Sequence, residues 1–179
     1  AINFELPGCF AMTETGHGSN VRDIETTATY DKETQEFIIH TPHLGARKDY
    51  IGNAALHAQM ATVFAQLVID GEEFGVHAFL VPIRDKHGSV LPGIHIEDDG
   101  FKIGLNGVDN GRIIFNRVRV PRENLLDKFG SVSPEGEYSS PINNSGKRFF
   151  MMLSTLVMGR VSISAAVNTI AKVGLAITV

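Results

Sequence analysis

Several features are scarce in this 179-residue sequence, and each scarcity excludes a class of protein. The single cysteine, Cys9, excludes an internal disulfide framework and a zinc site built from cysteine pairs. Lys and Arg together number 16, against 20 Asp and Glu, so the net charge of −4 predicts no basic surface for nucleic acid or for an anionic membrane. Tryptophan is absent. With 43% hydrophobic and 20% charged residues, the composition is that of a folded globular protein.

The order of the remaining patterns predicts a mainly β fold followed by a long helix. Short alternating or apolar runs, separated by polar turns, fill the chain from residue 9 to about residue 126. Their number and spacing predict an antiparallel β-barrel or sandwich of six to eight strands. The strands expected are residues 9–13, 26–30, 36–40, 60–69, 75–83, 94–97 and 112–120. The polar turn at residues 70–73 predicts that 75–83 is the antiparallel partner of 60–69.

The last fifty residues have a different character. Residues 131–146 are rich in Ser, Pro, Gly and Asn, which predicts a loop or linker. Residues 147–179 contain no proline and place apolar residues at helical spacing, which predicts a long helix. Arg160 and Lys172 interrupt this apolar run, which argues against a membrane span. A helix that is apolar on most sides usually packs among other helices, and the sequence holds no partner for it.

A glycine-rich loop at residues 13–20 (T-E-T-G-H-G-S-N) is the strongest local signal for chemistry. Glycines allow backbone N–H groups to approach an anion closely, and the Ser and Thr hydroxyls add donors. The loop is not a Walker A motif, because no Lys-Ser or Lys-Thr follows. It also differs from a dinucleotide-binding fingerprint, because it has only one Gly-x-Gly. On pattern alone, an ordinary polar turn between strands is the favoured explanation.

A second candidate is residues 48–53 (K-D-Y-I-G-N). An aromatic ring followed closely by glycine can present a flat surface and bare backbone to a planar ligand. The alternative is a strand entry in which Tyr50 covers the edge of the core. The histidines lack metal-ligand spacing, so no metal site is expected. Cys9 lies in an apolar strand and is interpreted as a small core residue.

The motifs, taken together and in order, resemble a known family. The loop T-E-T-G-H-G-S-N is similar to the oxidase form (T-E-L-G-H-G-T/S) of the flavin loop of acyl-CoA oxidases, and K-D-Y-I-G-N stands in place of K-W-W-P-G-G. G-V-H-A-F-L-V-P-I-R-D, L-P-G-I-H-I-E-D-D-G-F-K-I-G-L-N-G and F-N-R-V-R-V-P-R-E-N-L-L also match. The whole chain thus resembles the acyl-CoA oxidase branch of the acyl-CoA dehydrogenase superfamily.

This resemblance implies a division of the chain and a cofactor. Residues 1–130 would form the middle β domain, 131–146 a loop or linker, and 147–179 the truncated first helix of a C-terminal helical domain. The cofactor would be FAD. Ser19 would also lie close to the acyl-CoA, and Tyr50 departs from the usual Trp that shields the flavin. The resemblance implies cofactor contacts at Thr13, Gly16, Gly18, Ser19, Tyr50 and Gly52.

The activity implied is oxidation of acyl-CoA to trans-2-enoyl-CoA, with O2 reduced to H2O2. The family's catalytic base is a Glu from the C-terminal helical domain, beyond Val179, so no catalytic residue is assigned here and the 179 residues alone are expected to be inactive. Glu14 lies in the flavin loop, but the family pattern gives it no role as a base. Two alternatives remain open: an acyl-CoA dehydrogenase that uses an electron-transferring flavoprotein, and a non-catalytic β-sandwich binding module.

The chain's ends and its surroundings are expectations of the same kind. The sequence starts without Met and ends in an apolar helical run, which we interpret as a fragment of a longer enzyme. Full length, that enzyme would form a homodimer or higher homo-oligomer, with no nucleic-acid or membrane partner. The K-D-Y-I-G-N-A-A segment favours a bacterial, cytoplasmic protein, and a eukaryotic source would imply the peroxisome.

Overall fold

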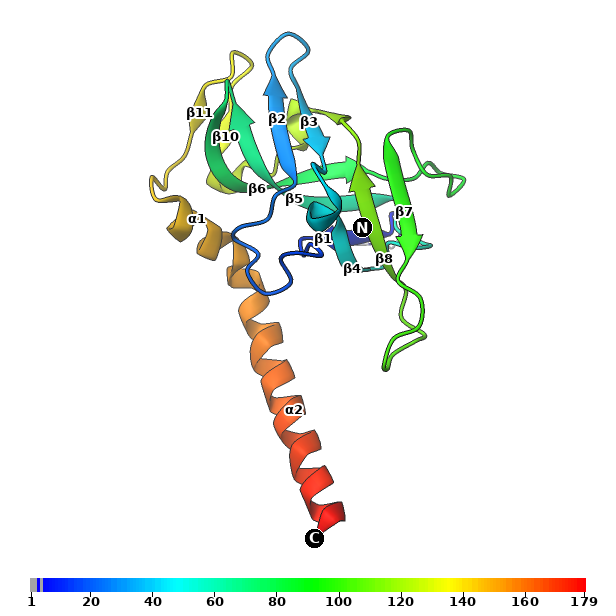
Figure 1. Ribbon diagram of the computed structural model, residues 1–179. Coiled ribbons are helices and arrows are strands. Elements are labelled where there is room, and N and C mark those ends of the chain that lie inside the picture. Colours follow the sequence, from blue (N-terminus) through cyan, green and yellow to red (C-terminus); the bar gives the residue numbers. More distant parts are fainter. Residues whose placement is uncertain (1–2, 4) are drawn as a thin grey trace.

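Two long antiparallel strands, β5 (Met60–Ile69) and β6 (Glu72–Pro82), lie at the centre of the fold (Figure 1). The computed structural model describes residue 3 and residues 5–179. Asp70 and Gly71 join the strands, and both have left-handed backbone (φ 52° and 83°). A tight hairpin turn of this hand needs positive φ at both central residues, which Asp-Gly supplies at little cost. The hairpin predicted from the sequence is therefore confirmed, although β6 starts three residues earlier than expected.

The opposite edge of β5 is shared by two shorter strands, both parallel to it. β1 (Gly8–Ala11) pairs with the first half of β5 and β2 (Thr27–Asp31) with the second half. The prediction of an antiparallel barrel or sandwich is therefore wrong in this respect, because the central sheet is mixed. The pattern of a strand's sequence indicates which of its faces is buried, but not whether its partner runs parallel or antiparallel to it. The parallel pairings of β1 and β2 with β5 could therefore not be predicted from local sequence.

Two further strands complete the six-stranded sheet, and three others form a second sheet. β3 (Glu36–His40) pairs with β2 and with β9 (Val118–Pro121), both antiparallel. The second sheet has the order β4 (Lys48–Gly52), β8 (Asn110–Phe115), β7 (Ile94–Asp98). The single strand predicted at 112–120 is therefore two strands in different sheets, because Arg117 adopts a left-handed conformation (φ 53°) and turns the chain between them.

The predicted loop at 131–146 contains a small amount of regular structure. The strands β10 (Ser131–Val132) and β11 (Tyr138–Ser139) form an antiparallel pair. Short 3-10 turns are found at Leu44–Ala46, Arg122–Asn124, Asp127–Phe129 and Leu153–Leu156.

The predicted long helix is present but interrupted. It consists of α1 (Ser145–Met152), the 3-10 turn at Leu153–Leu156, and α2 (Val157–Thr178). The Asn144 side chain accepts a hydrogen bond from the N–H of Lys147 (2.9 Å), so α1 starts before residue 147 with a normal N-cap.

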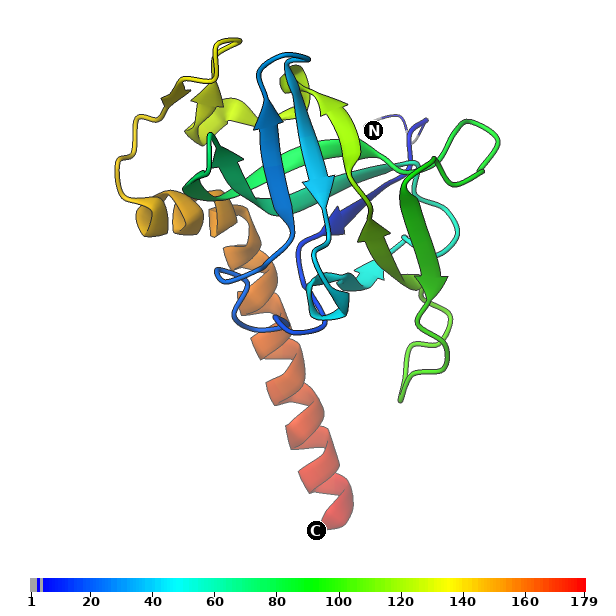
Figure 2. The same cartoon turned by 45° about the horizontal axis from the view of Figure 1, so that its top comes forward.

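Two apolar clusters hold these elements together, one on each face of the central hairpin. The larger one fills the space between the two sheets and includes the fully buried Phe37, Phe79 and Phe115. The smaller one lies on the other face, where Phe149 of α1 packs against Phe64 and neighbouring residues. Helix α1 therefore packs beside β6 on the outer face of the sheet, as the two views show (Figures 1 and 2).

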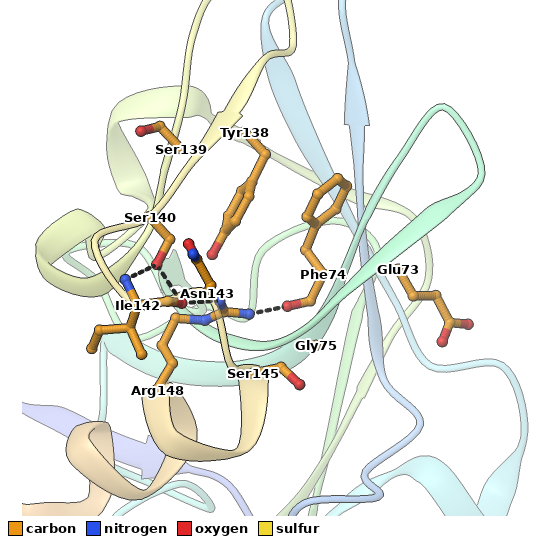
Figure 3. Close-up of a pocket in the computed structure, with 10 residues that line it drawn as sticks. All are labelled: Glu73, Phe74, Gly75, Tyr138, Ser139, Ser140, Ile142, Asn143, Ser145 and Arg148. Carbon is orange, nitrogen blue, oxygen red and sulfur yellow. Dashed lines mark hydrogen bonds between the residues drawn. The ribbon is translucent and has the colours of Figure 1, made fainter.

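A buried arginine also anchors α1 to the sheet, beside a pocket of about 610 Å³ (Figure 3). The Arg148 guanidinium donates hydrogen bonds to the carbonyl oxygens of Phe74 and of Ile142 (3.2 Å for the latter) and lies 5.4 Å from the centre of the Tyr138 ring. Phe74 belongs to β6 and Tyr138 to β11, so this one side chain joins helix, sheet and loop. The loop at 131–146 is thereby fixed to the β structure.

Helix α2 extends away from the sheets, and its described side chains are at least partly exposed (Figure 1). Its length and composition meet the criteria for a helix that can cross a membrane, with a mean hydropathy of 1.5. Two charged residues, Arg160 and Lys172, lie within it. The expectation from the sequence that this apolar helix packs among other helices stays a prediction.

Candidate functional site

The glycine-rich loop and the start of β4 are held side by side by backbone and side-chain bonds. The N–H of Asp49 donates to the carbonyl oxygen of Thr13 (3.1 Å), and the Thr13 hydroxyl donates to the carbonyl oxygen of Asp49 (2.7 Å). Two residues on, the N–H of Thr15 donates to the carbonyl oxygen of Arg47 (3.1 Å). The two motifs selected from the sequence therefore form one structural unit.

A pocket of about 520 Å³ opens beside this unit and is walled on one side by the start of α2. A second hollow of about 480 Å³ adjoins it and shares Thr13, Gly18 and Tyr50. The pocket is lined by Phe10, Met12, Thr13, Gly18, Ser19, Val21, Tyr50, Leu156 and Arg160.

The six predicted site residues divide into two groups. Thr13, Gly18, Ser19 and Tyr50 line the pocket, and Gly18 offers open space because an added Cβ would meet no atom within 4 Å. Gly16 does not line it. Its N–H donates to the Gly45 carbonyl oxygen (2.8 Å), and a Cβ there would lie 3.3 Å from that same oxygen.

Gly52, the last residue of β4, does not line this pocket either. It is exposed, and a Cβ there would meet nothing within 4 Å. Its backbone is therefore open to a flat ligand lying along β4, in the way that Gly18 is open in the loop.

Tyr50 holds an unusual conformation in the middle of β4. Its backbone is left-handed (φ 57°), and its side chain is 65% exposed, so the ring does not cover the core. The Tyr50 N–H donates to the carboxylate Oδ1 of Asp49 (3.0 Å), which fixes the turn. A non-glycine residue in this region costs on the order of 1–3 kcal/mol, and such strain is most often found where a side chain must face a ligand.

A fully buried ion pair lies beneath the pocket. Nζ of Lys48 is 3.0 Å from Oε1 of Glu14, and both side chains have no exposed surface. Nζ also donates to the carbonyl oxygens of Met12 (3.1 Å) and Phe64 (2.6 Å). Glu14 accepts from the N–H of Glu25 (2.7 Å) and from Thr26 through both its N–H (2.9 Å) and its hydroxyl (2.7 Å).

The environment of this pair explains its protonation. Burial lowers the pKa of Lys48 to about 8, and Glu14 opposes that effect. Burial alone would raise the pKa of Glu14, but Lys48 and the donors from Glu25 and Thr26 together bring it below its ordinary value. A carboxylate that is paired and hydrogen-bonded in this way is a poor general base, which agrees with the sequence interpretation of Glu14.

A second group of charges supports the other side of Tyr50. Arg112 Nε lies 3.2 Å from Oδ1 of Asp49 and 3.0 Å from Oδ1 of Asp99. Burial would raise the pKa of Asp49, but the Thr15 hydroxyl and Arg112 lower it. Burial and the neighbouring Asp49 both raise the pKa of Asp99. The carboxyl group of Asp49 therefore ionises at a lower pH than that of Asp99. Asp49 is the charged one of the two, and it accepts the hydrogen bond from the N–H of Tyr50.

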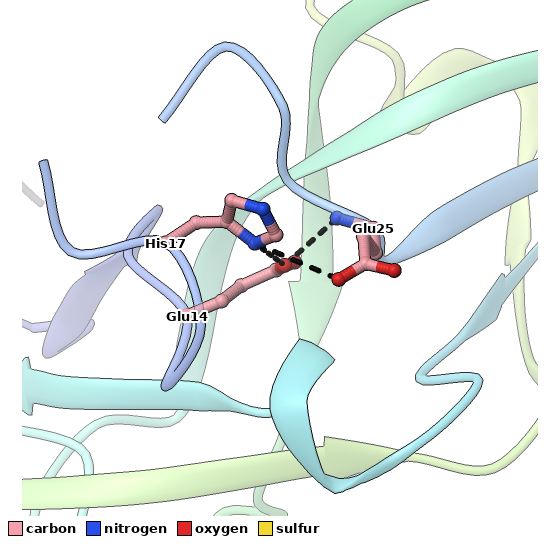
Figure 4. A group of neighbouring side chains, drawn as sticks. All are labelled: Glu14, His17 and Glu25. Carbon is pink, nitrogen blue, oxygen red and sulfur yellow. Dashed lines mark hydrogen bonds and ion pairs between the residues drawn. The ribbon is translucent and has the colours of Figure 1, made fainter. Parts of the chain in front are cut away.

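Three side chains near the loop have the ligand types of a metal site (Figure 4). Nδ1 of His17 lies 3.4 Å from Oε2 of Glu14 and 3.7 Å from Oε1 of Glu25. The Glu14 oxygens already receive the donors described above, and the Lys48 ammonium group stands next to them. A cation here would have to displace those donors and face that positive charge. We therefore assign the group to the structure of the loop.

Cys9 behaves as the sequence indicates. It is half-buried against the larger cluster, and burial raises the pKa of its thiol to about 12, so it stays protonated at neutral pH.

Sequence reasoning missed the pocket residues that lie far from the two motifs. Arg160 and Leu156 come from the start of the C-terminal helix, about 140 residues after the loop they face. Arg160 was noted in the sequence only as a charge that interrupts an apolar run. No local pattern marks it, because its position depends on how the helix docks on β6.

Comparison with known proteins identifies the family. The model of the acyl-CoA dehydrogenase middle domain matches residues 9–118, which is more than half of the chain. The chain belongs to this family. The matched range holds every predicted site residue and all the strands from β2 to β8, so the family assignment covers the part of the fold that presents the pocket.

The similar proteins are acyl-CoA oxidases. The chain is 53% identical over 177 residues to acyl-coenzyme A oxidase 3, peroxisomal, of Arabidopsis thaliana, covering 99% of this chain and 26% of that protein. The crystal structure of acyl-CoA oxidase 1 from Yarrowia lipolytica matches with a TM-score of 0.81 and 45% identity, over 87% of this chain and 22% of that one. Acyl-CoA oxidase 2 of Caenorhabditis elegans, bound with FAD, ascaroside-CoA and ATP, matches with a TM-score of 0.76 and 42% identity (80% and 22% covered).

Two facts follow from these matches. The chain spans about a quarter of the length of the curated relatives it matches. Relatives from Arabidopsis and human are named as peroxisomal, and the sequence-based preference for a bacterial, cytoplasmic protein finds no support among them.

Proposed function

We propose that this chain is the flavin-facing middle part of an FAD-dependent acyl-CoA oxidase, which converts acyl-CoA to trans-2-enoyl-CoA and reduces O2 to H2O2. The observation that carries the proposal is the 53% identity to an acyl-CoA oxidase over 99% of the chain. That agreement favours an oxidase over a dehydrogenase and over a binding module. The similar C. elegans oxidase bound to FAD and ascaroside-CoA supports the classes of cofactor and substrate.

The residues present suit a planar cofactor on observations of this chain. An added side chain at Gly18 or Gly52 would enter open space, so both leave their backbone uncovered. The ring of Tyr50, two residues before Gly52, is exposed. The Thr13 hydroxyl already donates its hydrogen to Asp49, so it offers lone pairs and would accept a hydrogen bond from a ring N–H. We propose cofactor contacts at Thr13, Gly16, Gly18, Ser19, Tyr50 and Gly52, with Ser19 also contacting acyl-CoA.

FAD, when bound, would supply the acceptor for the hydride from the β-carbon of the acyl group and the two-electron chemistry that reduces O2. The residues of this chain would orient the ring and shield it from water. Glu14 is not available to remove the α-proton, because it is buried and paired with Lys48. We propose that the base lies in the C-terminal helical domain, outside these 179 residues.

Three more expectations are kept as proposals. The division at residues 130 and 146 into β domain, linker and first helix fits the start of α1, which docks on the sheet before α2 extends away. The intact enzyme would form a homodimer or higher homo-oligomer. Because relatives are named as peroxisomal, we propose that a eukaryotic source would place the enzyme in the peroxisome.

The decisive experiment uses the intact protein with bound FAD. Anaerobic addition of acyl-CoA is expected to bleach the flavin absorbance, and admission of air is expected to restore it with one H2O2 formed per flavin. Reoxidation that needs an electron-transferring flavoprotein would instead indicate a dehydrogenase. A protein that purifies without flavin and does not bind it would indicate a binding module.

Filling the open space at Gly52 should weaken cofactor binding. In the intact protein, Gly52→Val puts a branched side chain where the bare backbone would meet the flavin. FAD binding is expected to weaken about tenfold, which corresponds to about 1.4 kcal/mol. The measurement is flavin fluorescence quenching during titration of the apoprotein. Gly107→Val is the matched control, because Gly107 is also open but lies in the loop between β7 and β8. Equal affinities for the two variants would contradict the contact.

A further inference from the structure

We propose that the buried Glu14–Lys48 ion pair is the positioning element that sets Thr13 and Tyr50 against each other at the pocket. This inference rests on the proposed function, because it concerns how the same pocket holds its ligand. Neither Glu14 nor Lys48 was assigned a role by the sequence motifs. Both are close in sequence to pocket residues, since Glu14 follows Thr13 directly and Lys48 precedes Tyr50 by two positions.

Lys48 connects three parts of the chain through one ammonium group. Its three donors go to the carbonyl oxygen of Met12 just after β1, to the carbonyl oxygen of Phe64 in β5, and to Glu14 in the loop. An ammonium group has three hydrogens, so all of its donors are used. The start of β4 is thereby fixed relative to the central sheet.

Glu14 connects the glycine-rich loop to the start of β2. It lies near the start of that loop and accepts hydrogen bonds from Glu25 and Thr26, which directly precede β2. The ten residues between them, which include Gly18 and Ser19, therefore form a loop closed at its base. The Thr26 hydroxyl extends the network, because it also lies 3.0 Å from the carbonyl oxygen of Ala46, close to β4.

The pair is also the point where the two motifs meet. Glu14 and Lys48 form an isolated antiparallel bridge, and the reciprocal bonds between Thr13 and Asp49 lie directly beside it. A shift of Lys48 would therefore move Asp49, which receives the N–H of Tyr50 and fixes its left-handed backbone. Burying two charges is unfavourable relative to an apolar pair of similar size, so stability alone does not explain the presence of the pair.

The test compares variants of the intact, FAD-loaded enzyme. Glu14→Gln keeps the size of the side chain but removes the charge opposite Lys48. We expect kcat to fall about tenfold to a hundredfold, with a smaller change in KM, because a displacement of about 1 Å at a reacting centre has an effect of this size. The flavin absorbance bands are expected to shift as well, because Thr13 and Tyr50 would contact the ring differently.

Two further variants keep the proposal open to refutation. Thr26→Val removes one hydroxyl donor to Glu14 at constant shape, and it is expected to change kcat and the flavin spectrum in the same direction by a smaller factor. If Glu14→Gln does not fold, Thr26→Val still provides the test. Arg119→Gln is the control, because it breaks an exposed ion pair with Asp31 and Glu36 on β2 and β3, and it should leave kcat and the spectrum unchanged.

The outcomes separate the two proposals. Glu14→Gln and Thr26→Val that bind FAD with the wild-type spectrum and wild-type kcat, even if they unfold at lower temperature, would show a structural role only and overturn the inference. A wild-type protein that is not reduced by acyl-CoA would overturn the proposed function.

Discussion

Replacing Lys48 by methionine is expected to destabilise the protein by about 3–5 kcal/mol, because it leaves the Glu14 carboxylate buried without its counter-ion. The methionine side chain has a similar length and fits the same space, so little of the loss comes from packing. The carbonyl oxygens of Met12 and Phe64 also lose their donor. Urea unfolding followed by far-UV circular dichroism measures the difference.

The double variant Glu14→Gln, Lys48→Met tests the cause. Without a lone buried charge, it is expected to be more stable than Lys48→Met. The coupling free energy of the pair is the loss in the double variant minus the summed losses in the single variants Glu14→Gln and Lys48→Met. Lys32→Met is the matched control. Lys32 pairs with Asp70 at the surface, where both side chains are substantially exposed (43% and 64%), and loss of such a pair has an effect of about 0–1 kcal/mol. A similar loss for Lys32→Met and Lys48→Met would contradict the assigned importance of burial.

Acidification should destabilise the fold through His77. Burial lowers the pKa of this histidine from 6.5 to about 4, with Arg148 acting in the same direction and the Gly75 carbonyl opposing. As pH falls from about 6.5 to about 4, His77 therefore becomes protonated in the unfolded chain but stays neutral in the folded chain. Stability rises with pH in this window and is lost on acidification, by up to about 3 kcal/mol from this group.

Two hydrogen bonds hold the neutral His77 ring in place and explain why it resists protonation. Nδ1 donates to the Gly75 carbonyl oxygen (3.0 Å), since a carbonyl can only accept, so Nε2 is left to accept from the Tyr138 hydroxyl (3.0 Å).

The measurement is the free energy of unfolding between pH 7 and pH 4 for wild type and for His77→Gln. Glutamine does not titrate, so the variant should show a shallower fall over this range, with Glu14 responsible for part of what remains at the acid end. His95→Gln is the control, because His95 is exposed on β7. Parallel pH profiles for wild type and His77→Gln would refute the assignment.

The sequence predicted the elements that depend on local pattern and missed those that depend on contacts across the chain. Asp70-Gly71 predicted the central hairpin, because both residues tolerate the backbone the turn needs. The run at 112–120 reads as one strand in the sequence but changes sheet within it, because Arg117 adopts positive φ without being glycine. The parallel partners of β5 had no local signal at all.

The same division applies to the candidate site. The two motifs supplied Thr13, Gly18, Ser19 and Tyr50, and these line one pocket. Arg160 was missed because only the docking of the C-terminal helix brings it there. The partnership of Glu14 with Lys48 was missed for a related reason: a charged residue in a polar motif gives no indication that its side chain is buried.

β1 pairs with β5, which lies far along the chain, whereas β2 also pairs with its sequence neighbour β3. The β5–β6 hairpin, with its two-residue turn, needs only local contacts and is expected to form first. Glu14 would then remain exposed to solvent until β4 pairs and brings Lys48 beside it. β1 is therefore expected to become protected later than the β2–β3 and β5–β6 hairpins, and amide hydrogen exchange during refolding should show this late protection.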